Sequence, residues 1–334
     1  MSSPFRVAIA GAGFMGEVHA LRWQRHTDVE LLGVFDCEAD SAARLELPVF
    51  KSWDEMLAAK PDVIDICTPT TTHVELIEKA CQAGLSILVE KPLARTLADC
   101  DRCIELVEKY KVNLMVGHVV RYFPEYQAAR TAVLDGRIGT PATARMGRLA
   151  PFPRAQRKVN WYADTASSGG LILDMIIHDL DWLRWCFGPA VRIFGKGLYE
   201  KIGDENRLDY ALVTVRFQSG LIAHITGSWA HVSGFRTNFE LAGDGGMLEH
   251  DSALSAPLSI QLRAKEGTAV SGLALPESPV ALLEDPYYLE QRAFLDALKK
   301  KEQPPVSAHD AREAVRLALA ALKSVETGKV VELV

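Results

Sequence analysis

The sequence lacks any apolar run that approaches the ~20 residues a helix needs to cross a bilayer. It also lacks a basic run, and its formal net charge is −6 over 334 residues. These absences argue against a membrane or a nucleic acid as the main partner. A short apolar run near the N-terminus leads directly into a glycine-rich turn, so we interpret it as a first strand and not as a signal peptide.

Cysteine is scarce and scattered, with six residues placed mostly among apolar neighbours. This pattern fits a reduced cytoplasmic protein better than a disulfide framework. Cys100 and Cys103 have C-x-x-C spacing, but they fall inside a predicted helix with no second pair nearby. A structural zinc site needs about four ligands, so we predict no metal site.

Residues 1–120 alternate short apolar runs with amphipathic segments. Strands are expected at 6–11, 30–36, 62–68, 86–91 and 113–117, and helices at 15–26, 53–59, 73–83 and 97–110. Strands that are apolar on both faces and separated by helices indicate a parallel sheet covered on both sides. The fold class predicted here is an α/β Rossmann domain.

The pattern of apolar and polar residues changes after residue 120. A helix at 125–135 is followed by alternating runs at 142–150, 191–200, 210–220, 221–231 and 237–246, a loop at 264–284, and helices at 287–300 and 308–327. This pattern predicts an α+β domain with a large, open, mostly antiparallel sheet. We therefore expect domains at 1–120 and 121–334, with the last helix able to pack back on the first domain.

The stretch GAGFMG, residues 11–16, is a G-x-G-x-x-G that follows a predicted strand and opens a helix. Gly11 permits the tight turn, Gly13 lets the backbone approach a pyrophosphate, and Gly16 lets the helix pack close to the strand. Asp36 ends the second strand and can accept both adenosine ribose hydroxyls. Its charge, with no arginine at Cys37, favours NAD over NADP. The alternative is an ordinary α/β turn with an unrelated aspartate.

A strongly apolar helical stretch, GGLILDMIIHDL at 169–180, contains Asp174 and His178 four positions apart, and therefore on one face. Asp181 follows near the same face, with no role assigned. A histidine can accept a proton near neutral pH, so the pair could also serve as a catalytic base with a neighbouring carboxylate. The alternative is a buried polar pair whose members satisfy each other.

Four motifs occur in the order GAGFMG, CTPTTTH (67–73), VEKPLA (89–94) and GGLILDMIIHDLDWL (169–183). Together they resemble the glucose–fructose oxidoreductase/inositol dehydrogenase family, Gfo/Idh/MocA, over nearly the whole chain. The resemblance implies an NAD-binding domain followed by an open-sheet domain, a frequently cis Lys91–Pro92 bond, and hydride exchange between nicotinamide and a secondary alcohol of a polyol, inositol or sugar. We expect His178 to act as general base, Lys91 to stabilise the alkoxide, and Asp174 to hold a neighbouring hydroxyl or orient the other two groups.

The expected cofactor-binding residues are Gly11, Gly13, Phe14, Met15, Gly16, Asp36, Thr68, Pro69, Thr70, His73, Glu90, Lys91 and His118. The expected substrate-binding residues are Lys91, Arg121, Trp161, Tyr162, Asp174 and His178. His118 is equally consistent with a strand-end histidine bonded to backbone, and the two aromatic residues with simple packing. His231 stays unassigned.

Three other functions remain open. Gly117-His118 resembles family members that act on nucleotide sugars, so a nucleotide-sugar 3-dehydrogenase is one alternative. A glycosidase of the same fold that retains NAD and a non-catalytic NAD-binding regulator are the others. We expect a small-molecule polyol or sugar as partner and a homodimer or homotetramer formed through the C-terminal sheet, whose uncovered face would otherwise expose an apolar patch.

Overall fold

The computed structural model describes residues 3–38, 42–152, 168–202, 205–232, 234–254, 258–262 and 285–333. The chain divides into two compact units, Met1–Val119 with Glu284–Val315, and Val120–Leu283 with Arg316–Val334. Trp161, Tyr162 and the loop expected at 264–284 lie outside the described residues. None of the described helices is both long enough and apolar enough to span a membrane.

The first unit is built on a six-stranded parallel sheet with the order β3-β2-β1-β4-β5-β6. Its strands are β1 (Phe5–Ala10), β2 (Val29–Phe35), β3 (Val49–Phe50), β4 (Val63–Ile66), β5 (Ser86–Glu90) and β6 (Leu114–Gly117). All four residues of β4 and of β6 are buried, as expected for strands covered on both faces. The predicted parallel sheet is confirmed, and β3, which is only two residues long, is an addition to it.

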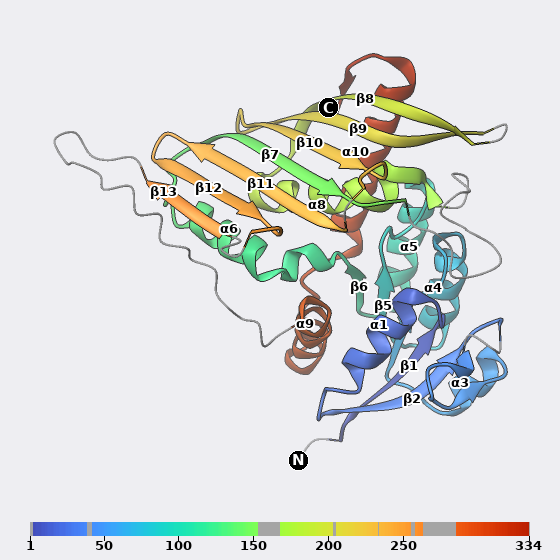
Figure 1. Ribbon diagram of the computed structural model, residues 1–334. Coiled ribbons are helices and arrows are strands. Elements are labelled where there is room, and N and C mark those ends of the chain that lie inside the picture. The colour runs from blue at the N-terminus through green and yellow to red at the C-terminus, as the bar shows by residue number, and fades with distance from the viewer. Residues whose placement is uncertain are drawn as a thin grey trace. The chain divides into compact units, whose positions relative to one another are not determined.

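Helices cover both faces of this sheet (Figure 1). They are α1 (Phe14–Trp23), α3 (Trp53–Ala58), α4 (His73–Gln82), α5 (Leu97–Tyr110) and α9 (Pro286–Lys300). Helix α9 packs beside α1 on one face, and α4 packs beside α5 on the other. A late segment of the chain, α9, thereby belongs to the unit formed by the first 119 residues.

The second unit contains an eight-stranded sheet with the order β13-β12-β11-β7-β10-β9-β8-β14. Its strands are β7 (Pro141–Leu149), β8 (Ala190–Ile202), β9 (Glu205–Phe217), β10 (Ile222–Ser228), β11 (Arg236–Gly243), β12 (Gly246–Asp251), β13 (Leu258–Leu262) and β14 (Val331–Glu332). Among the described strands of this sheet, only β7 and β10 pair in parallel, and every other pairing is antiparallel. The predicted mostly antiparallel sheet is confirmed.

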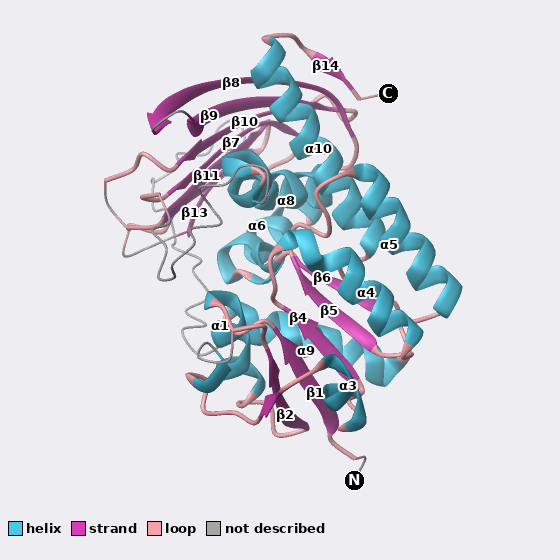
Figure 2. Cartoon of the chain, turned by 90° about the vertical axis from the view of Figure 1, so that its right-hand side faces the viewer, coloured by secondary structure: helices cyan, strands magenta, loops and turns pink. Residues whose placement is uncertain are grey.

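Figure 2 shows helices gathered on one side of this second sheet. They are α6 (Pro124–Leu134), the π-helical turn η3 (Ile172–Ile176), α8 (Ile177–Phe187) and the end of α10 (Ala308–Thr327). Turn η3 lies against β10, where a Cβ on Gly227 would come within 2.6 Å of Ile176. The end of α10 lies against β8, because the backbone N–H of Gly195 donates to Ser324 Oγ at 2.9 Å.

Candidate functional site

The glycine turn between β1 and α1 leaves no room for side chains. Gly11 has φ +102°, and a Cβ there would lie 2.7 Å from the backbone of Cys67 on the neighbouring strand segment. A Cβ on Gly16 would lie 2.0 Å from the carbonyl oxygen of Gly11. These approaches fit the roles expected of a tight turn and a close helix–strand contact.

Gly13 is the N-cap residue of helix α1 and has no side chain that could cap it, so the N–H groups of the first turn are left for a ligand. Asp36, just after β2, is held beside this turn, because its Oδ2 accepts the backbone N–H of Ala12 at 2.6 Å. Its Oδ1 accepts the N–H of Glu38 at 2.8 Å. A glycine cradle, uncapped helix N–H groups and an oriented carboxylate are the features that hold the pyrophosphate and ribose of a dinucleotide, so these residues fit NAD.

The residues expected near the nicotinamide follow β4. Thr68 is half-buried, Pro69 is exposed and Thr70 is buried in a 3₁₀ turn, Thr70–Thr72. His73 begins α4 and is buried, with its two ring nitrogens each 3.0 Å from a carbonyl oxygen, those of Pro92 and Thr68. His73 thus ties the segment after β4 to the segment after β5. Burial lowers the pKa of His73, and a neutral imidazole donates to only one of these two carbonyl oxygens.

Glu90 and Lys91 lie at the carboxyl end of β5. Glu90 is buried and its Oε2 accepts the backbone N–H of Lys91 at 3.1 Å, whereas Lys91 itself is half-buried. The Lys91–Pro92 peptide bond is cis, as predicted. His118, just after β6, is 1% exposed, and its backbone N–H donates to the carbonyl oxygen of Val116. The contacts of these residues with a cofactor stay predictions.

Asp174 and His178 are the accessible positions of an otherwise buried segment. Asp174 sits at the centre of the π-helical turn η3, and His178 is the second residue of α8. Both are half-buried, while their apolar neighbours in the segment are buried. These neighbours are Leu171, Ile172, Leu173, Met175, Ile176 and Ile177. π-Helical turns are rare and occur often at functional sites.

The remaining carboxylates of this segment are bound to arginines. Asp179 accepts two hydrogen bonds from Arg148 of β7, at 2.8 and 2.9 Å, and both side chains are at most 3% exposed. Asp181 accepts two from Arg121, at 2.7 and 2.6 Å, with equal burial. The helix runs on to Phe187, so Asp181 lies inside α8 and not beyond its end. Substrate contact by Arg121 stays a prediction, but its guanidinium fork is buried against Asp181.

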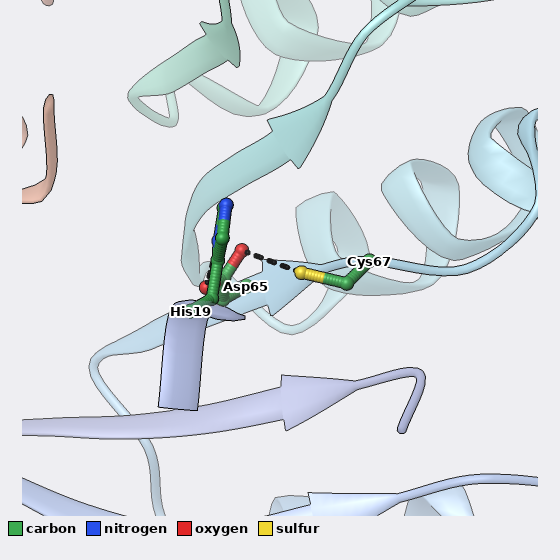
Figure 3. Close-up of side chains that lie close together, drawn as sticks. All are labelled: His19, Asp65 and Cys67. Atoms are coloured by element: carbon green, nitrogen blue, oxygen red, sulfur yellow. Dashed lines mark hydrogen bonds and ion pairs between the residues drawn. The ribbon is translucent and has the colours of Figure 1, made fainter. Parts of the chain in front are cut away.

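Sequence reasoning did not single out His19, Asp65 or Glu290, all of which are 0% exposed in the first unit. His19, Asp65 and Cys67 bring their polar atoms within 4.8 Å of one another (Figure 3). The available signal was Asp65, a carboxylate in the middle of the buried strand VIDI. Cys100 and Cys103 are buried in α5, and burial raises the pKa of both thiols to about 12, as suits inert helix residues.

Known proteins match this chain along its length. Residues 5–118 match the family profile described as an oxidoreductase family with an NAD-binding Rossmann fold, and residues 126–249 match the GFO/IDH/MocA C-terminal domain. The myo-inositol 2-dehydrogenase of Thermotoga maritima is 30% identical, covering 98% of each chain. The UDP-N-acetylglucosamine 3-dehydrogenase of Acidithiobacillus ferrooxidans is 33% identical over 67% of this chain and 66% of its own length.

A solved structure agrees with these sequence matches. A myo-inositol dehydrogenase from Corynebacterium glutamicum superposes with a TM-score of 0.82 at 27% identity, covering 99% of both chains. The geometry of the glycine turn and of Asp36 therefore agrees with the two domain matches. The chain belongs to the GFO/IDH/MocA family of oxidoreductases, and residues 5–118 form that family's NAD-binding Rossmann domain.

Proposed function

We propose that this protein is an NAD-dependent dehydrogenase that oxidises a secondary alcohol of an inositol, another polyol or a sugar. The observation that carries the proposal is that Asp174 and His178 alone stay accessible on a buried segment whose other carboxylates are fixed by arginines. The names of the relatives, myo-inositol 2-dehydrogenase among them, support this substrate class.

Oxidation of a secondary alcohol removes a proton from oxygen and a hydride from carbon. We assign the proton to His178, because a neutral imidazole is a suitable base near neutral pH. Lys91 stabilises the negative charge that develops on the same oxygen, and Asp174 accepts a hydrogen bond from a neighbouring hydroxyl or orients the other two groups. When bound, the nicotinamide ring would supply the acceptor for the hydride.

Asp36 supports NAD over NADP as the preferred cofactor. Its carboxylate is already oriented by two backbone N–H groups, and carboxylate oxygens suit the 2′- and 3′-hydroxyls of a ribose. A 2′-phosphate would place like charge beside it. The preference is measured directly by comparing kcat/KM for the two cofactors.

A nucleotide-sugar substrate is the second candidate, supported by the relative named UDP-N-acetylglucosamine 3-dehydrogenase. The experiment that separates the candidates is a panel of inositols, hexoses, sugar acids and nucleotide sugars with NAD or NADP, followed by absorbance of the reduced cofactor. Net reduction with one class identifies the substrate. Cleavage of a glycoside without net reduction identifies an NAD-retaining glycosidase, and cofactor binding without any turnover identifies a regulator.

Substitution of His178 tests the assigned base. We expect His178→Ala to bind NAD as the parent does but to lose kcat by roughly 10²–10⁴-fold, the usual contribution of general acid–base catalysis. His309→Ala is the control, because His309 lies exposed on α10 and its ring nitrogen is 3.4 Å from Glu108 at the surface. Turnover of His178→Ala within twofold of the parent would remove this residue from the role of base.

A further inference from the structure

A chain of buried ionisable side chains runs beneath Lys91 within the first unit. His19 of α1 stands between two carboxylates: its Nδ1 lies 2.8 Å from Asp65 Oδ2, and its Nε2 lies 3.1 Å from Glu90 Oε1. The side chains of His19 and Asp65 are 0% exposed, and that of Glu90 is 9% exposed. An imidazole placed in this way can compensate both carboxylates only as a cation.

Asp65 is the anchor at the lower end of this chain. Its Oδ2 also accepts the indole N–H of Trp23 at 2.6 Å, and its Oδ1 accepts the Cys67 thiol at 3.5 Å (Figure 3). The 2.8 Å distance from His19 is that of a charge-assisted hydrogen bond. Two ligands of one tetrahedral zinc ion stand about 3.3 Å apart, from bonds of about 2.0 Å. The 2.8 Å distance between His19 and Asp65 is shorter than that, so these two side chains are joined by a hydrogen bond and not by a shared zinc ion.

Glu90 is the upper end of the chain and joins His19 to Lys91. One of its carboxylate oxygens faces His19, and the other accepts the backbone N–H of Lys91 at 3.1 Å. The carboxylate thus spans the gap between α1 and the residue that follows β5. Any shift of Glu90 is transmitted to the backbone of Lys91.

The protonation states follow from what surrounds each group. Burial alone would lower the pKa of His19, but the charge and hydrogen bond of Asp65 raise it well above its usual value. Burial alone would raise the pKa of Glu90, but His19 and the charge of Lys91 lower it. Cys67 and Tyr287, which also face the cluster, stay protonated because burial raises the pKa of each.

Glu290 of α9 completes the surroundings of His19. It is 0% exposed, and burial together with the charge of Glu90 raises its pKa well above the usual value. Neither of its oxygens has a hydrogen-bond partner among the described residues. A protonated Glu290 adds no negative charge to the cluster. The two carboxylates of Asp65 and Glu90 are therefore balanced by the His19 imidazolium and the adjacent Lys91.

We infer that His19 is a positioning residue for Lys91, which it reaches through the Glu90 carboxylate. The inference rests on the role proposed for Lys91 in alcohol oxidation. A side chain that must act on a reacting oxygen has to be held within about 0.5 Å of its working position by the groups behind it. His19 and Asp65 supply that support from the buried side of the sheet.

The first test observes His19 directly and needs no substrate. In the full-length protein labelled with ¹⁵N-histidine, we expect the His19 ring to stay doubly protonated at pH 8, with its signal assigned by its loss in His19→Gln. His309, which is exposed on α10, serves as the internal reference signal from a histidine at the surface. Glu90→Gln should make the His19 ring neutral at a lower pH than in the parent. A neutral His19 at pH 8 in the parent, or no effect of Glu90→Gln, would overturn the inference.

The second test asks whether His19 acts through Lys91. We expect His19→Gln to reduce kcat by roughly 10–100-fold with the Kd for NAD within about threefold of the parent. In a Lys91→Met background, His19→Gln should cause less than a threefold further loss. Equal loss in both backgrounds would mean a merely structural role. If Lys91→Met by itself keeps full turnover, the proposed function of Lys91 fails, whereas the NMR result on His19 stands independently.

Discussion

At the scale of single residues, His26 gives the first unit a defined response to acid. It follows α1, is 3% exposed and stacks on Tyr288 of α9 with ring centroids 4.1 Å apart. Burial, aided by the charge of Arg292, lowers the pKa of His26 to about 4 from its usual 6.5. The unfolded chain therefore takes up a proton before the folded chain does, and stability falls as the pH drops from 6.5 toward 4.

The expected size of this effect is about 2 kcal/mol at pH 5, from about 1.4 kcal/mol per pH unit. We expect His26→Phe, which keeps a stacked ring but cannot titrate, to lose that much of the difference in unfolding free energy between pH 7 and pH 5. Denaturant unfolding at the two pH values measures it. His309→Phe, at an exposed position, is the control for the loss of a surface histidine. An undiminished difference in His26→Phe would contradict the assignment.

Residues whose roles depend on nearby sequence could be predicted, and residues whose roles depend on distant partners could not. Gly11, Gly16 and Asp36 belong to one local motif, and their geometry agrees with it. His19 and Glu290 are 271 residues apart and share an environment only because α9 packs on α1. A buried histidine inside a helix looks the same in sequence whether it is neutral or an imidazolium between two carboxylates.

At the scale of elements, helix α8 is fixed from two directions. Asp179 binds Arg148 of β7, and Asp181 binds Arg121 of the 3₁₀ turn Val119–Tyr122. Each pair is bidentate and buried, which constrains both the position and the rotation of the helix that carries His178. Loss of one partner leaves the other as an uncompensated buried charge.

We therefore expect Asp179→Asn to lower the free energy of unfolding by about 3–5 kcal/mol. The control is Glu332→Gln, whose partner Arg192 forms an exposed pair on the same sheet and should cost less than about 1 kcal/mol. Urea unfolding curves of the parent and both variants provide the comparison. Equal small losses in the two variants would show that the buried pair does not stabilise α8.

The elements themselves were largely predictable, with exceptions of two kinds. Parallel strands stood out as apolar runs, and α5 and α10 have the predicted bounds. Strand β3 has two residues, too few for any periodicity. The π-helical turn at Ile172–Ile176 was also unforeseen, because one extra residue per turn hardly changes an apolar pattern that is buried nearly all round.

At the scale of the whole molecule, the two units are assembled from interleaved stretches of chain. The texture of the sequence changes near residue 120, where the second unit begins. The hydrophobic periodicity of the sequence does not indicate where the later helices pack. Gln291 and Arg292 of α9 bond to His19 and Asp28, so residues after 284 contribute to the first unit's core and surface. Such returns are decided by tertiary packing.

Among the described residues, one face of the second unit's sheet carries no helix, and there we expect a second copy of the chain to bind. Helices η3, α8 and the end of α10 occupy the opposite face. The uncovered face is mixed in character and not simply apolar: Leu212 is 41% exposed on β9, with Arg216 and His224 exposed nearby. A surface of mixed polarity like this one suits the interface of a closed homodimer or homotetramer.

Charge placed at the centre of this face tests the expectation. In a two-fold interface, the carboxylate introduced in one copy would lie near the carboxylate introduced in the other copy. Leu212→Asp should therefore repel the partner as well as lose apolar contact. We expect the parent to sediment as a dimer or tetramer in analytical ultracentrifugation and Leu212→Asp to shift toward a smaller species by at least tenfold in Kd. Val232→Asp, at a loop position that is 98% exposed, should sediment like the parent. If the parent sediments as a monomer at micromolar concentration, there is no such interface. If Leu212→Asp assembles like the parent, the contact lies elsewhere, because a partner that covers β9 must contact residue 212.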